Sequence, residues 1–224
     1  MNSQKRFLDR IPLSPQQSSG EELANAITHG IGVGISIAAL VILVVFAAQM
    51  SDTWKIVSFS IYGATMIILF LSSTLYHTFT QPYIKRFFRI LDHSSIFLLI
   101  AGTYTPVTIG TMRGGWGWTL FGVIWGLTLL GIVLKIFAMG KKKWISILVY
   151  LLMGWIIVIA IKPLLASVPP SFLIWILIGG LAYSLGIGFY VAKNMRYHHA
   201  IWHLFVLAGC ISHFFGMLTL INNA

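Results

Sequence analysis

Seven long apolar stretches dominate the sequence and leave little chain between them. They cover residues 26–49, 55–79, 91–109, 116–138, 144–161, 171–192 and 199–221. A helix needs about 20 apolar residues to cross the hydrocarbon core of a bilayer, and each stretch is close to this length. Only 9% of the 224 residues are charged, whereas average soluble domains carry about 25%. We therefore predict an all-α fold, a polytopic membrane protein made of one seven-helix transmembrane bundle.

The residues before the first apolar stretch form a separate part of the chain. Residues 1–18 are polar and contain proline and glutamine, so we expect a loose N-terminal tail. The pair Ser18 and Ser19 then stands three residues before the pair Glu21 and Glu22, which is the capping-box pattern of a helix start. A helix is therefore expected to begin near residue 19 and to run into the first span.

Basic residues are distributed unevenly around the transmembrane domain, residues 19–224. Twelve Lys and Arg lie in the tail and in the loops on its side, and three lie on the other side, namely Lys55, Arg113 and Lys162. By the positive-inside rule, the N-terminus of this multi-pass protein lies in the cytoplasm and the C-terminus outside the cell membrane. A net charge of +10 would suggest nucleic acid in a soluble protein. Here the basic residues flank the spans, so the predicted partners are membrane lipids and not nucleic acid.

Histidines gather at one end of the predicted bundle. In the orientation above, six of the seven fall in the cytoplasmic leaflet: His29, His77, His93, His198, His199 and His203. At a rise of about 1.5 Å per residue, His213 lies roughly 15 Å deeper than His203. Ionisable groups are costly within a membrane, so this convergence predicts a functional site. We expect His198 to be interfacial and His213 to pack between helices.

Spacing among these histidines indicates a metal site. His199 and His203 are four residues apart, so both imidazoles project from one helix face, as in two-histidine zinc sites. Together with His77 they would fill three of the four tetrahedral positions of Zn2+, leaving one for water, as in catalytic zinc sites. Asp92 could hydrogen-bond that water or orient an imidazole. Three histidines favour zinc over iron, and the single cysteine, Cys210, excludes a cysteine-rich structural site.

Other polar residues near this end have a structural alternative beside the functional one. Glu22 could cap the first helix or belong to the site, and Asn25 could join helices through a hydrogen bond or belong to the site. Ser73 could bond the carbonyl oxygen four residues before it. His29 stays open between the two interpretations. His93 is expected to support the site from its edge.

With these residues in hand, the chain resembles the bacterial hemolysin III family, within the wider progestin and adipoQ receptor group. The matching motifs are Glu22-x-x-Asn25 with Thr28-His29, Ser73-x-x-x-His77, Asp92, and His199-x-x-x-His203 followed by His213-Phe214-Phe215-Gly216. The resemblance covers the chain from residue 20 onward, with the same number and order of spans.

The resemblance implies a zinc ion held at the positions of His77, His199 and His203. It also implies that Asp92 reaches the metal through water and that Ser73 lines the same site. The group looks related to membrane ceramidases, which suggests hydrolysis of a lipid amide, whereas the hemolysin name implies cytolysis and pore formation. The chain lacks the long N-terminal extension of the eukaryotic receptors, which argues against a hormone-receptor role.

Three functions follow as hypotheses. The first is a zinc-dependent intramembrane hydrolase of a lipid amide or ester, with Asp92 as general base and Ser73 as hydrogen-bond donor to the developing oxyanion. The second is a pore-forming cytolysin, although no span carries a polar stripe along its length. The third is a zinc-bound regulator that senses the state of membrane lipids without chemistry and uses the same ligands.

Overall fold

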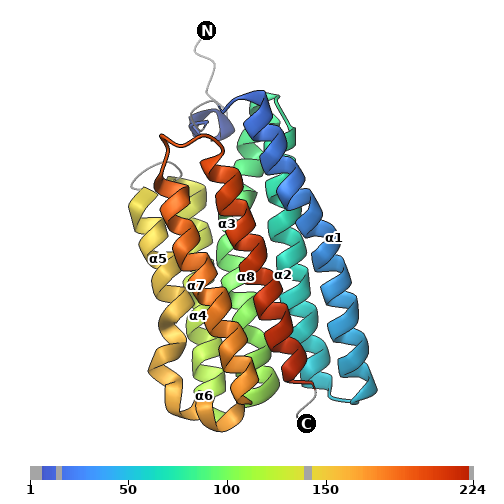
Figure 1. Ribbon diagram of the computed structural model, residues 1–224. Coiled ribbons are helices and arrows are strands. Elements are labelled where there is room, and N and C mark those ends of the chain that lie inside the picture. Colours follow the sequence, from blue (N-terminus) through green and yellow to red (C-terminus); the bar gives the residue numbers. More distant parts are fainter. Residues whose placement is uncertain (1–6, 14–16, 139–142, 222–224) are drawn as a thin grey trace.

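The computed structural model is a bundle of long, roughly parallel and antiparallel helices (Figure 1). It describes residues 7–13, 17–138 and 143–221. The helices are α1 (Ser19–Gln49), α2 (Thr53–Thr78), α3 (Pro82–Thr105), α4 (Gly114–Ala138), α5 (Lys143–Trp155), α6 (Ile161–Ser167), α7 (Pro170–Val191) and α8 (His198–Thr219). The two ends of the chain lie at opposite ends of the bundle (Figure 1).

Among the described residues, seven helical segments are long and apolar enough to cross a membrane, which confirms the predicted seven-span, all-helical architecture. Two of them are interrupted helices. A π-helical turn, Pro106–Met112, continues α3, and a 3-10 segment, Ile156–Ala160, joins α5 to α6. The first interruption begins at Pro106, where a backbone N–H is missing and the regular hydrogen-bond ladder cannot continue.

The third span is longer than the sequence predicted. It begins at Pro82, whereas the apolar stretch begins at residue 91. Proline suits the first turn of a helix because its missing N–H needs no partner there. The turns that follow contain Lys85, Arg86 and Arg89, which lower the local hydropathy without breaking the helix. Apolar content therefore locates the part of α3 that matches the hydrocarbon and misses its polar first turns.

The start of α1 follows the predicted capping box. Ser18 Oγ accepts a hydrogen bond from the Glu21 N–H at 3.3 Å, and the Glu21 carboxylate accepts one from the Ser18 N–H at 2.9 Å. Part of the tail before it contacts α3. Ile11 is buried against Ile90, and Arg86 donates to the Ile11 carbonyl oxygen at 3.1 Å. Residues 1–6 and 14–16 of that tail lie outside the described residues.

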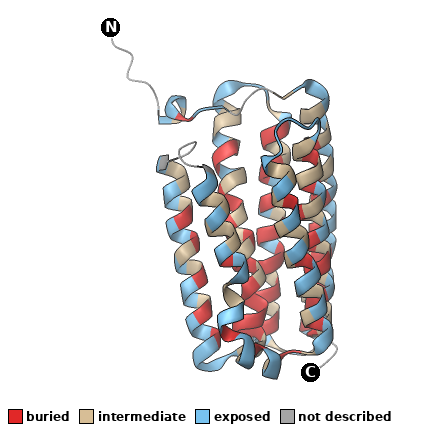
Figure 2. Ribbon diagram, turned by 60° about the vertical axis from the view of Figure 1, so that its left-hand side comes forward, coloured by how far each residue is buried: buried red, intermediate tan, exposed pale blue. Residues whose placement is uncertain are grey.

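Helices α2, α3 and α8 form the centre of the bundle. Larger shares of these helices are buried than of α1, α4, α5 and α7, which surround them, and the buried positions face inward while the outer faces are exposed (Figure 2). The outer faces carry large apolar side chains, as expected of surfaces that face lipid. The end of α2 and the starts of α3 and α8 meet at the end of the bundle near the N-terminus, and these segments contain the predicted site residues.

Candidate metal centre

Three histidines meet at the end of the bundle where the N-terminus lies. His77 is on the last turn of α2, and His199 and His203 are on the first two turns of α8. One ligand atom from each lies within 4.8 Å of those of the other two, so this triad could hold a metal ion. Sequence spacing placed the two α8 histidines on one face, and the helix packing brings His77 to them.

Glu22 fixes the ring of His77. The Nδ1 atom of His77 lies 2.7 Å from Glu22 Oε2, and Lys85 Nζ donates to the other carboxylate oxygen at 2.9 Å. Because a carboxylate only accepts, the His77 proton is on Nδ1, and Nε2 keeps its lone pair. A carboxylate on the far nitrogen of an imidazole is the arrangement that orients metal-ligating histidines. Glu22 therefore belongs to the site, while its neighbour Glu21 caps the helix.

His203 is oriented by the backbone of α1. Its Nδ1 atom lies 3.2 Å from the carbonyl oxygen of Asn25 and 3.2 Å from Thr28 Oγ1. The carbonyl oxygen can only accept, so Nδ1 carries the proton and Nε2 is left with its lone pair. The Asn25 side chain itself bonds Gln17 Oε1 at 2.6 Å and approaches His77 Nδ1 at 3.4 Å. Asn25 thus joins the tail, α1 and the site.

Unpartnered polar atoms concentrate around this triad. Four buried residues in and around the triad have side-chain N or O atoms with no hydrogen-bond partner among the described residues. These atoms are Asn25 Oδ1, both ring nitrogens of His29, Ser73 Oγ and His77 Nε2. Buried polar atoms are normally satisfied, so such a cluster is unusual in a packed interior. A cation bound by the imidazoles and a coordinated water would satisfy several of them. The donor set therefore fits a metal ion.

His29 lies against the triad. Its ring stacks on that of His203 with centroids 3.5 Å apart and an angle of 11° between the planes. It is buried, and it lines the cavity described below. The structure thus places His29 beside the three candidate ligands, as a neighbour of one of them.

Ser73 on α2 and Asp92 on α3 lie next to the triad. Ser73 is one helical turn before His77 and is fully buried. Its Oγ atom makes none of the backbone bonds that we considered as the structural alternative. Asp92 Oδ2 lies 3.3 Å from His93 Nδ1, and the same nitrogen lies 3.0 Å from the carbonyl oxygen of Arg89.

The two remaining histidines are not among the three candidate ligands. His198 Nδ1 lies 3.1 Å from the carbonyl oxygen of Phe189, near the end of α7. His213 Nε2 lies 3.3 Å from the carbonyl oxygen of Ile176, and the His213 ring packs on Tyr183. His213 therefore packs between α7 and α8, as predicted.

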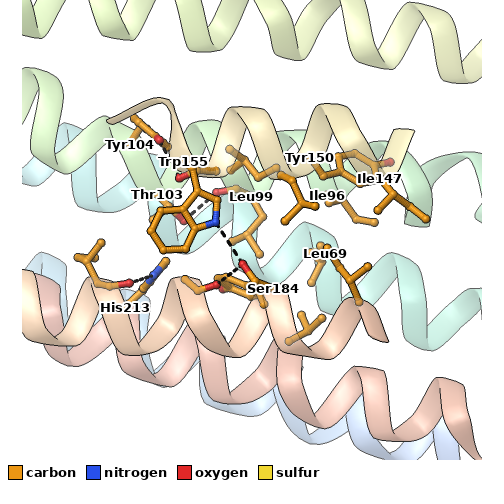
Figure 3. A pocket seen from close by; sticks show the side chains of 18 of the residues that line it. Leu69, Ile96, Leu99, Thr103, Tyr104, Ile147, Tyr150, Trp155, Ser184 and His213 are labelled. Atoms are coloured by element: carbon orange, nitrogen blue, oxygen red, sulfur yellow. Dashed lines mark hydrogen bonds between the residues drawn. The ribbon is translucent and has the colours of Figure 1, made fainter. Parts of the chain in front are cut away.

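A cavity of about 490 Å³ leads from the triad into the bundle. His29, Asp92, His199 and His203 line one part of it, and His213 lines another. Much of the remaining wall is apolar, with Leu69, Ile96 and Leu99 on one side of the view in Figure 3. Its volume is in the range of small-molecule sites. The shape and lining suit the hydrocarbon part of a lipid whose polar group lies at the triad.

Sequence reasoning missed two contributors to this region, Lys85 and Arg89. Both were counted only as orientation signals, whereas Lys85 holds Glu22 and Arg89 is buried in the cavity wall. A signal for Arg89 was present: it stands between two apolar pairs, Phe87-Phe88 and Ile90-Leu91, three residues before Asp92. That spacing places it on the same helix face as the aspartate.

Comparison with known proteins agrees with the motifs. A family model described as "Haemolysin-III related" matches residues 17–214. The chain is 50% identical over 198 residues to the "Hemolysin-3 homolog" of Bacillus subtilis (strain 168), covering 88% of this chain and 93% of that protein. It is 47% identical over 198 residues to the "Hemolysin-3" of Bacillus cereus, covering 88% and 90%. A more distant relative, 25% identical over 207 residues and covering 88% and 83%, is the "Monocyte to macrophage differentiation factor" of Homo sapiens. This chain therefore belongs to the hemolysin III family of multi-pass membrane proteins.

Proposed function

We propose that this protein is a zinc-dependent hydrolase that cleaves an amide or ester bond of a lipid within the membrane. The observation that carries the proposal is the triad itself: His77, His199 and His203 converge, and both His77 and His203 are held through Nδ1 so that Nε2 is available. Three imidazoles with an open fourth position are the donor set of catalytic zinc. Zinc bound there supplies an activated water and polarises a carbonyl oxygen.

Two residues of the chain are suited to the proton and charge changes of this reaction. Asp92 lines the cavity and is supported by His93, so it can accept a proton from the attacking water and hand it to the leaving group. Ser73 has a buried hydroxyl with no partner among the described residues, and it can donate a hydrogen bond to the oxygen on which negative charge develops.

The apolar cavity supports a lipid substrate. Two triad residues, His199 and His203, line it together with many apolar side chains, so an acyl chain has room beside the histidines. Figure 3 shows Leu69, Leu99 and His213 along its wall. By the positive-inside rule the triad lies in the cytoplasmic leaflet, and the lipid carbonyl would reach it from that side. The protein supplies orientation and exclusion of bulk water, which raise the rate of hydrolysis when the carbonyl is held next to the metal.

The proposal is tested by measuring release of fatty acid from ceramide-type lipid amides and from lipid esters by purified, zinc-loaded protein. Asp92→Asn should keep zinc and lower turnover by about 100-fold or more, because it removes the general base and keeps the shape. The matched control is Asp9→Asn, whose carboxylate pairs with Arg86 at the surface, and it should retain wild-type turnover. Full turnover in Asp92→Asn would contradict the assigned role.

A second candidate, cytolysis, is supported by the names of the two Bacillus relatives, a hemolysin-3 homolog and hemolysin-3. The experiment that separates it from the hydrolase is dye release from liposomes containing the protein. Release that persists in His203→Ala would favour the cytolysin, because a pore does not need the triad. A regulator without chemistry would bind zinc and yet show neither hydrolysis nor dye release.

A further inference from the structure

Arg89 is a buried cation in the wall of the cavity. It lies on α3, one turn before Asp92, and only 2% of its surface is exposed. Its Nε and Nη1 atoms have no hydrogen-bond partner in the part of the chain that the structure describes. Arginine is rarely buried without a partner because removing its charge from water is costly. An unpaired guanidinium beside a cavity therefore points to a ligand that pairs with it.

The acidic side chains nearby are engaged elsewhere. Asp92 pairs with His93, and Glu22 pairs with His77 and Lys85. Among the described residues, no carboxylate oxygen lies within 4.0 Å of a guanidinium nitrogen of Arg89. No carboxylate of the described residues therefore neutralises the positive charge of Arg89 by direct contact.

The net charge of the cavity wall is positive, like that of Arg89. Its charged side chains, apart from histidines, are Arg89, Lys135 and Asp92. Two cations therefore face one anion, and a divalent metal at the triad would add to the excess of positive charge. In an environment of low dielectric constant such an excess strongly favours an anionic ligand.

We propose that the lipid held in this cavity is anionic, and that its phosphate or carboxylate oxygens accept hydrogen bonds from Arg89. The guanidinium group matches the planar, forked geometry of these anions better than any other side chain. The acyl chain would occupy the apolar part of the same cavity. The inference rests on the proposed function for what happens to the lipid, and it adds the charge of the substrate.

Native mass spectrometry of protein in an uncharged detergent tests the inference by counting bound ligands. The probes are phosphatidic acid, oleate, diacylglycerol as a neutral lipid, and inorganic phosphate alone. Wild type should retain phosphatidic acid or oleate at least about tenfold more tightly than Arg89→Gln does, because a buried charge-assisted hydrogen bond is lost. Diacylglycerol should bind equally to both proteins. Binding of inorganic phosphate without the lipids would overturn the assignment to a lipid.

Two control variants separate this site from general charge and from folding. Arg86→Gln removes a cation on the same helix that already pairs with Asp9, and it should leave anionic-lipid binding unchanged. Arg89→Lys keeps the positive charge and loses the planar, two-pronged donor geometry of the guanidinium group. Its affinity for anionic lipid should therefore lie between those of wild type and Arg89→Gln. Equal retention of anionic lipid by Arg89→Gln and wild type would overturn the inference.

Thermal stability adds a readout that distinguishes ligand binding from a purely structural role. If Arg89 serves to bind a ligand, its replacement removes an unpaired buried charge from the lipid-free protein. In the absence of lipid, Arg89→Gln should therefore melt at the same temperature as wild type or at a higher one. The rise in melting temperature that phosphatidic acid produces in wild type should disappear in the variant. A large fall in melting temperature without lipid would show a structural role and overturn the inference.

Failure of the proposed hydrolase can be told apart from failure of this inference. The binding assay is repeated after the metal has been removed with a chelator. Arg89-dependent binding that persists without any hydrolysis supports the anion site and contradicts the hydrolase. Hydrolysis of neutral lipid amides that is indifferent to Arg89 supports the hydrolase and contradicts the anion site.

Discussion

Glu21 and Glu22 are neighbours in the chain with different roles. The carboxylate of Glu21 accepts hydrogen bonds from the N–H groups of Ser18 and Tyr197, which closes the start of α1 and ties it to the start of α8. The carboxylate of Glu22 instead pairs with His77 and Lys85. Both residues fit a capping pattern in sequence, and only the position of α2 shows which of them reaches the histidine.

Replacing Glu22 with Gln should weaken zinc binding without removing a ligand. The amide can no longer hold the His77 Nδ1 proton as a charged acceptor, and loss of such a supporting group typically lowers metal affinity about 10- to 100-fold. A competition titration with a zinc chelator measures this directly. Glu21→Gln is the matched control, and it should keep the zinc affinity while losing some stability of α1. Equal affinities in wild type and Glu22→Gln would contradict the role of Glu22.

At the level of elements, the site depends on the close approach of α2 and α3. A Cβ atom added at Gly102 of α3 would lie 2.9 Å from the Cβ of Thr65 on α2, closer than real side chains approach. Both residues are buried. Glycine therefore permits a spacing between these helices that brings His77 and Asp92 into one region.

Gly102→Ala should destabilise the bundle by about 1–3 kcal/mol, because the added methyl group forces the two central helices apart. The free energy of unfolding in detergent, followed by circular dichroism, measures the effect. Gly126→Ala on α4 is the control, since nothing lies within 4 Å of the added Cβ there, and alanine favours the helix by up to about 1 kcal/mol. Equal stability of the two variants would contradict the packing argument.

The fifth span is bridged at its interruption by a side chain from α3. The Tyr104 hydroxyl donates to the carbonyl oxygen of Gly154 at 2.9 Å and accepts from the Ile157 N–H at 3.1 Å. It replaces helical hydrogen bonds where α5 gives way to the 3-10 segment. The sequence predicted a continuous helix up to residue 161 and did not use a signal that follows the break: Pro163 has no N–H to donate to the carbonyl oxygen of Ile159, inside the 3-10 segment.

Tyr104→Phe should lower the free energy of unfolding by about 1–3 kcal/mol, because two backbone groups lose their partner in a dry interior. Thermal melting in detergent checks this prediction. Tyr83→Phe, at an exposed position, is the comparison and should melt as wild type does. A Tyr104→Phe protein that is as stable as wild type would show that the break does not depend on this hydroxyl.

For the whole molecule, the distribution of basic residues predicts which end faces the cytoplasm. The end that contains the triad also has Lys85, Arg86, Lys193 and Arg196, and the opposite end has Arg113, which pairs with Asp52. The direction of insertion, with the triad toward the cytoplasm, is a prediction from the positive-inside rule.

Labelling of engineered cysteines in intact cells tests the direction of insertion. The native Cys210 is buried and should not react with a maleimide that cannot cross the membrane. Gly115→Cys, at the end opposite the triad, should be labelled in intact cells. Arg196→Cys, near the triad, should be labelled only after the cells are permeabilised. The reverse pattern would place the triad in the outer leaflet.

The sequence predicts the architecture of this protein well because apolar content is itself the signal for a membrane span. It also predicts the triad, since His199 and His203 share a face and His77 ends a span on the same side. It does not predict Arg89, because a count of basic residues treats every cation alike, whether it is exposed in a loop or buried in a cavity wall. Such distinctions arise only from the packing of helices that are distant in sequence.

The central claim, a zinc site formed by His77, His199 and His203, is tested most directly by the metal content of the purified protein, measured by inductively coupled plasma mass spectrometry. Wild type prepared without chelators should contain about one zinc per chain, and His77→Ala and His203→Ala should contain almost none. His198→Ala should keep the metal, because His198 is not one of the three candidate ligands and its Nδ1 atom lies 3.1 Å from the carbonyl oxygen of Phe189. Wild-type protein without zinc, or zinc that persists in both triad variants, would contradict the account.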